Sequence, residues 1–159
     1  MRGQLKSHLA LVVGVFTAVG VGLALTAYVS MGWARLQFVT DAAGASPETF
    51  GPVFVAAVAV QTTVTAFLVG PVLAGVLGFL VGSRYTVGST AAVVTGGGSL
   101  LGFYVLALCA VGGVVAGLSG AGTEQVYGVG QVFGTLLVAG VPTLVVGAAG
   151  GVLGSATNA

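Results

Sequence analysis

The chain of 159 residues is 57% hydrophobic and only 4% charged, with a net charge of +1 at pH 7. A soluble domain carries about 25% charged residues, and four basic with three acidic side chains cannot cover a water-exposed surface. The apolar content excludes a disordered chain, and the 29 glycines follow no collagen-like period. The composition therefore predicts an all-α integral membrane protein in contact with the lipid bilayer, because a helix satisfies its own backbone hydrogen bonds in lipid.

Apolar stretches long enough to cross a bilayer occur at residues 9–31, 54–82, 89–117 and 129–153. One crossing needs about 20 residues, and two would need about 40. We therefore expect a single transmembrane domain over residues 1–159 with four transmembrane helices. The first stretch follows Arg2 and Lys6, as in a signal peptide. However, it exceeds the roughly 7–15 apolar residues that are typical of one.

The basic residues predict the orientation of the chain. Arg2 and Lys6 precede the first stretch and Arg84 lies between the second and third, whereas Arg35 lies in the loop that also holds Asp41 and Glu48. Lysine and arginine in short loops remain on the cytoplasmic side. Both termini are therefore expected to be cytoplasmic (N-in/C-in), in a multi-pass protein of the cell membrane.

Helix-start signals recur before the second and fourth stretches. Ser46 can cap a helix that has Pro47 in its first turn and Glu48 near the positive end of its dipole. Thr123 and Glu124 repeat the cap and the acid. This similarity raises the hypothesis of a tandem repeat of two helical hairpins. The alternative is that glycine-rich apolar sequences resemble one another by chance.

Two features of the sequence could interrupt the helices. The glycines at 96–98 each lower helix propensity by about 1 kcal/mol, so they could break the third helix. Pro71 and Pro142 lie inside the second and fourth helices. Each proline removes a backbone N–H, and we expect it to bend its helix statically rather than to act as a hinge.

Small residues at every fourth position mark a face on each of two helices. The first face contains Gly14, Ala18 and Gly22, and the second contains Gly70, Ala74, Gly78 and Gly82. Residues four apart share a helix face, and such small side chains let two backbones approach closely in lipid. We expect both faces to pack against other helices. The alternative is a substrate pathway lined by backbone.

Polar side chains occupy similar positions in the second and fourth stretches. The pairs are Gln61 with Thr65 and Gln131 with Thr135. Each pair lies on one helix face, and the two pairs could face each other if the repeat exists. Uncharged polar groups of this kind serve as hydrogen-bond glue between helices, and the alternative is a polar path or binding site.

Catalytic and metal sites have little support in this sequence. The only histidine, His8, lies near Lys6, and the only cysteine, Cys109, lies in an apolar stretch. No ionisable side chain occupies the middle of a stretch, where a proton-coupled pump would need one. The scattered basic residues form no patch for nucleic acid. We therefore expect no enzyme activity, no cofactor and no metal.

Two hypotheses for the function remain. In the first, the protein is a pore or carrier component that acts through helix packing, with self-association. In the second, it is a scaffold or assembly subunit that binds another membrane protein through its small-residue faces. The hypotheses differ in whether the polar side chains meet water, or meet protein and lipid.

Overall fold

The computed structural model describes residues 2–38, 47–118 and 129–157. This part of the chain forms four α-helices: α1 (Arg2–Phe38), α2 (Pro47–Gly82), α3 (Gly88–Leu118) and α4 (Val129–Ala156). Each of the four contains a segment that is long and apolar enough to cross a membrane. The protein is therefore an all-α, multi-pass membrane protein, as the composition predicts.

The helix boundaries agree with the local signals where these lie in the described residues. α2 begins at Pro47 and ends at Gly82, whereas the signals at Ser46, Thr123 and Glu124 lie outside the described residues. α3 continues unbroken through residues 96–98. Two of these glycines are buried against neighbouring helices, so tertiary packing offsets their low helix propensity. α2 and α4 likewise continue through their prolines.

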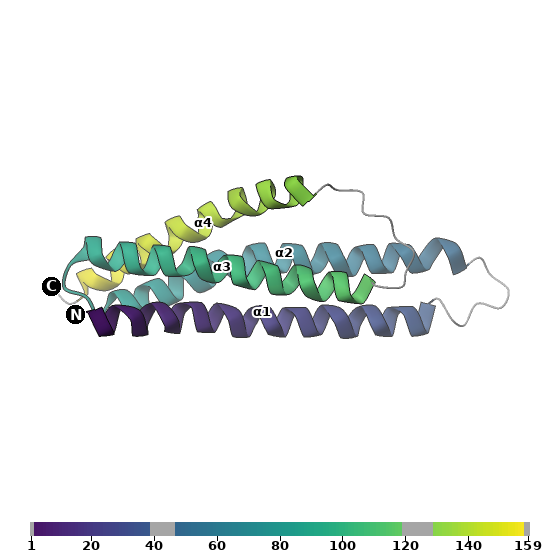
Figure 1. Cartoon of the computed structure of the whole chain (residues 1–159), viewed down its shortest axis with the longest axis horizontal. Coiled ribbons are helices and arrows are strands. Elements are labelled where there is room, and N and C mark those ends of the chain that lie inside the picture. Colours follow the sequence, from purple (N-terminus) through teal and green to yellow (C-terminus); the bar gives the residue numbers. More distant parts are fainter. Residues whose placement is uncertain (1, 39–46, 119–128, 158–159) are drawn as a thin grey trace.

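The helices run alternately in opposite directions, so both termini lie at the same end of the bundle (Figure 1). α1 packs most extensively along α3, and α2 along α4, which makes two parallel pairs. In a tandem repeat of the hairpins α1–α2 and α3–α4, a twofold axis would place α1 on α3 and α2 on α4. The contact between α2 and α3 would then have an equivalent contact between α4 and α1. α2 does contact α3, but the described parts of α1 and α4 do not touch. The arrangement therefore departs from the symmetry of a tandem repeat.

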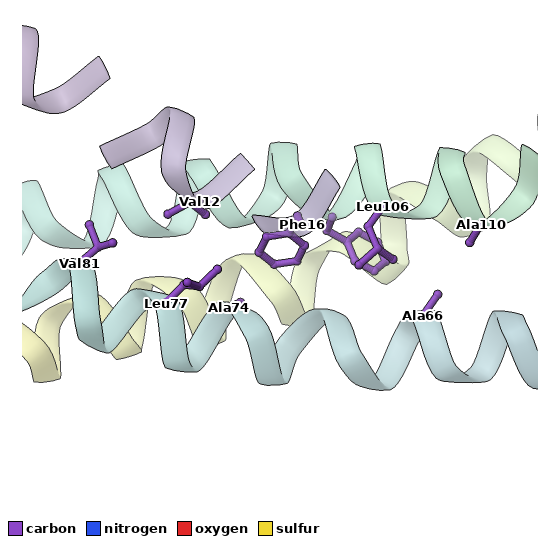
Figure 2. Packing of buried hydrophobic residues seen from close by; sticks show 9 residues of the cluster. Val12, Phe16, Ala66, Ala74, Leu77, Val81, Leu106 and Ala110 are labelled. Carbon is purple, nitrogen blue, oxygen red and sulfur yellow. The ribbon is translucent and has the colours of Figure 1, made fainter. Parts of the chain in front are cut away.

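An apolar core lies between α1, α2 and α3. Phe16 of α1 and Phe103 and Leu106 of α3 are completely buried, and Ala74 and Leu77 of α2 pack with them. Figure 2 shows side chains from these three helices in the part of the bundle where they meet. The small residues of α2 leave room for the large rings of its neighbours.

Glycines bring the backbones of both parallel pairs together. A Cβ atom added at Gly113 of α3 would lie 2.5 Å from the backbone of Ala24 in α1. One added at Gly78 of α2 would lie 2.5 Å from the carbonyl oxygen of Gly147 in α4. Both distances are far below van der Waals contact, so these positions admit only glycine without a shift of the helices.

The small-residue face predicted on α1 is not the face that packs within the chain. Gly14, Ala18 and Gly22 are exposed, and a Cβ atom added at either glycine would meet nothing within 4 Å. The opposite face packs on α3 instead, where Gly20 approaches Leu106. A helix with small residues on both faces gives no spacing signal to choose between them. The α2 face behaves differently, since Gly70, Ala74, Gly78 and Gly82 are all buried.

The end of the bundle that holds the termini is closed by a contact between α1 and the α2–α3 turn. His8 Nδ1 and the Tyr85 hydroxyl share a hydrogen bond of 2.9 Å, with the rings edge to face. Burial raises the pKa of the Tyr85 phenol above its usual value. Lys6 and Arg84 are exposed near the same end.

Candidate functional site

The structure does not bring the two predicted polar pairs face to face. Gln61 is exposed on α2 and Thr65 is half-buried, while Thr135 is exposed on α4. Gln131 lies in the first turn of α4, but its side chain is outside the described part of the chain. Figure 1 shows this end of α4 standing apart from α2.

Buried hydroxyl groups occur instead on the packed faces of α3 and α4. We call this set the hydroxyl row; it consists of Ser155, Thr95, Ser99 and Thr143, all of them buried. Gly88, at the start of α3, lies against the Ser155 hydroxyl. From Ser155 to Thr143 the row follows α4 for roughly 18 Å, at about 1.5 Å per residue. Since a hydrocarbon core is about 30 Å thick, the row reaches from the termini end to the middle of the membrane.

Thr95 joins α3 to α4. Its hydroxyl lies 2.8 Å from the carbonyl oxygen of Ala91 in its own helix and 2.8 Å from that of Gly147 in α4. One proton is therefore shared between two acceptors on different helices. This contact is possible because Gly147 has no side chain to separate the helices, and it acts as hydrogen-bond glue.

Ser99 and Thr143 differ from Thr95, because their hydroxyls have no hydrogen-bond partner among the described residues although both are completely buried. A Cβ atom added at Gly147 would lie 2.7 Å from Ser99 Oγ, and one added at Gly70 would lie 3.2 Å from Thr143 Oγ1. The two hydroxyls thus face glycine backbone on α4 and α2. Because Thr143 and Gly147 are one turn apart on α4, these groups lie at neighbouring levels of the bundle.

Other threonines in the bundle return their hydroxyls to their own helix. The hydroxyls of Thr17, Thr62 and Thr63 each donate to the carbonyl oxygen four residues earlier, at 2.8 to 2.9 Å. This is the usual way in which a helix accommodates threonine in lipid. An unpaired buried hydroxyl costs about 1–3 kcal/mol. Ser99 and Thr143 therefore need an explanation other than local helix chemistry.

Aromatic rings lie on the outer side of the hydroxyl row, toward the end of the bundle away from the termini. The Phe103 ring lies 6.2 Å from that of Phe67 and 6.0 Å from that of Tyr104. The Tyr104 hydroxyl donates a long hydrogen bond of 3.5 Å to the carbonyl oxygen of Leu137. We call these three rings the aromatic cluster. Phe103 lies one turn beyond Ser99 on α3, so the cluster adjoins the outer end of the row.

The residues of the hydroxyl row are not among the predicted sites, although their spacing is visible in the sequence. Thr95, Ser99 and Phe103 are four apart on α3, and Thr143, Gly147, Gly151 and Ser155 are four apart on α4. Such spacing places each set on one face. Only the packing of α3 against α4 shows that the two faces meet.

No protein-family model, no curated protein and no solved structure matches this chain. Its function is therefore inferred from the geometry of the bundle.

Proposed function

We propose that this protein is a non-enzymatic pore or carrier component of the cell membrane, and that its polar pathway follows the hydroxyl row between α3 and α4. The observation that carries the proposal is the pair of buried, unpartnered hydroxyls at Ser99 and Thr143. Polar groups at membrane depth are found where helices bond one another or where a pathway runs. Thr95 bonds one helix to another through its contact with Gly147. The unpartnered hydroxyls of Ser99 and Thr143 favour a pathway.

The proposed orientation is with both termini in the cytoplasm. Lys6 and Arg84 are exposed near the end that carries the termini, and basic residues favour the cytoplasmic side. A reporter enzyme that is active only in the cytoplasm, fused separately to each end, should be active in both fusions. Activity in one fusion alone would contradict this orientation.

Cysteine labelling tests the pathway directly. Iodoacetamide reacts with thiolates, which form where water reaches a thiol. In a Cys109→Ala background, we expect Ser99→Cys to react with iodoacetamide in membranes at least about 10-fold faster than native Cys109 does in the unmodified chain. Cys109 is the matched control because it lies on the same helix and is half-buried. The measurement is the rate of mass increase of the intact protein.

A cysteine at Thr65 distinguishes this pathway from one along the polar pairs that the sequence suggested. Thr65→Cys, in the same Cys109→Ala background, should react as slowly as native Cys109. Fast labelling of Thr65→Cys with slow labelling of Ser99→Cys would move the pathway to α2. Slow labelling of both would refute a polar pathway along either set of residues.

The second candidate function is a scaffold or assembly subunit, and the exposed face of α1 favours it. Gly14, Ala18 and Gly22 face away from the other helices, as a surface for another membrane helix would. A stoichiometric partner retained after gentle detergent extraction, and lost in Ala18→Leu, would support this function over the pore or carrier.

A further inference from the structure

We infer that the solute carried along the hydroxyl row is a small uncharged molecule that both donates and accepts hydrogen bonds, of the class of glycerol or urea. The inference rests on the proposed function, since it names the substrate class of the same pathway. It follows from the chemistry of the row, from the absence of charge on the two helices that form it, and from the closeness of their backbones.

The chemistry of the row matches a solute that is donor and acceptor at once. Each hydroxyl can donate one hydrogen bond and accept others. The hydroxyls of Ser99 and Thr143 neither donate nor accept a hydrogen bond among the described residues. A polyol or an amide presents paired donors and acceptors and would satisfy both side chains. A purely apolar solute would leave both hydroxyls without a hydrogen bond, so the free-energy cost of burying them would remain.

The absence of charge argues against an ion. Neither α3 nor α4 contains Asp, Glu, Lys, Arg or His anywhere between their first and last residues. Ion-selective paths replace the hydration shell with rings of carbonyl oxygens or with charged side chains. The carbonyls of the row belong to continuous helices, and the Gly147 oxygen already accepts from Thr95. An uncharged solute loses much less hydration free energy in such surroundings than an ion does.

The closeness of α3 and α4 limits the size of the solute. A Cβ atom added at Gly96 of α3 would lie 3.0 Å from the Cβ atom of Ala148 in α4. At the outer side of the row, one added at Gly140 would lie 2.8 Å from the Tyr104 hydroxyl. A small separation of the two helices would therefore admit only molecules of a few heavy atoms, and such a solute would pass the aromatic cluster to leave the row on its outer side.

The experiment uses the purified full chain in egg phosphatidylcholine vesicles. Stopped-flow light scattering gives the permeability to glycerol and to urea, and ion-sensitive dyes give the fluxes of Na⁺, K⁺ and Cl⁻. We expect the protein to raise permeability to glycerol or urea several-fold over empty vesicles, with ion fluxes unchanged. Ser99→Ala and Thr143→Val should each lower the added permeability by roughly 3–10-fold, the effect of losing about one hydrogen bond to the solute.

Thr63→Val is the matched control, because the Thr63 hydroxyl is exposed on α2 and bonds to Ala59 in its own helix. Its permeabilities should equal those of the unmodified protein. Ser99→Ala should also retain or gain thermal stability, since it removes a buried hydroxyl that has no partner among the described residues. A loss of flux without a loss of stability therefore reports on the pathway and not on folding.

The contrary outcomes are distinguishable. Ion flux that Ser99→Ala abolishes, without any flux of glycerol or urea, would overturn the uncharged solute and leave the pore function standing. Equal losses in Ser99→Ala and Thr63→Val would overturn the role of the hydroxyl row. Folded protein that raises none of these fluxes, in several independent preparations, would overturn the pore or carrier function together with the inference.

Discussion

Replacing Gly113 by Leu is expected to destabilise the bundle by more than about 3 kcal/mol, because overpacking against backbone cannot be relieved by a change of rotamer. A Cβ atom alone would lie 2.5 Å from both the Cα atom and the carbonyl oxygen of Ala24. α1 would have to move away from α3, although these two helices form the most extensive contact in the bundle. Thermal unfolding in detergent, followed by circular dichroism, measures the effect.

The neighbouring residue provides the control. Gly112 is exposed, and a Cβ atom added there would meet nothing within 4 Å. Gly112→Leu should therefore leave stability unchanged or raise it slightly, since leucine has about 1 kcal/mol more helix propensity than glycine. The two variants have the same composition and change adjacent positions in one helix. Similar unfolding temperatures for both would contradict the α1–α3 contact.

Replacing Gly78 by Leu is expected to have a comparable effect on the other parallel pair. An added Cβ atom would lie 2.5 Å from the Gly147 carbonyl oxygen and 3.2 Å from the Gly151 nitrogen. The backbones of α2 and α4 would have to separate, which should also cost more than about 3 kcal/mol. Displacement of Gly147 would also remove one of the two acceptors of the Thr95 hydroxyl, leaving the Ala91 carbonyl oxygen.

Val76→Leu is the control on α2, because Val76 is 53% exposed and lies two residues from Gly78, on the other side of the helix. We expect its unfolding temperature to remain close to that of the unmodified protein. If Gly78→Leu and Val76→Leu have the same unfolding temperature, the small-residue face of α2 must contact lipid and not α4. The result would also remove the packing that places the hydroxyl row.

The sequence alone determines that the chain lies in a membrane and how many times it crosses. The hydropathy of a segment is the sum of its residues, so four apolar stretches with all seven charges outside them are enough to predict four crossings. All four helices of the structure agree with this expectation. The start of α2 at Pro47 and its end at Gly82 also follow from local chemistry. The orientation stays a prediction from the position of the basic residues.

Only the tertiary structure decides which helix faces meet. In lipid, both the packed and the exposed face of a helix are apolar, so hydrophobic periodicity does not distinguish them. The choice of Gly20 over Gly14 and Gly22 depends on how α1 fits against α3, which local spacing does not contain. Local spacing also does not show that the hydroxyls of Ser99 and Thr143 are buried without a partner. That follows from the packing of α2, α3 and α4, which places these hydroxyls against glycine backbone from distant parts of the chain.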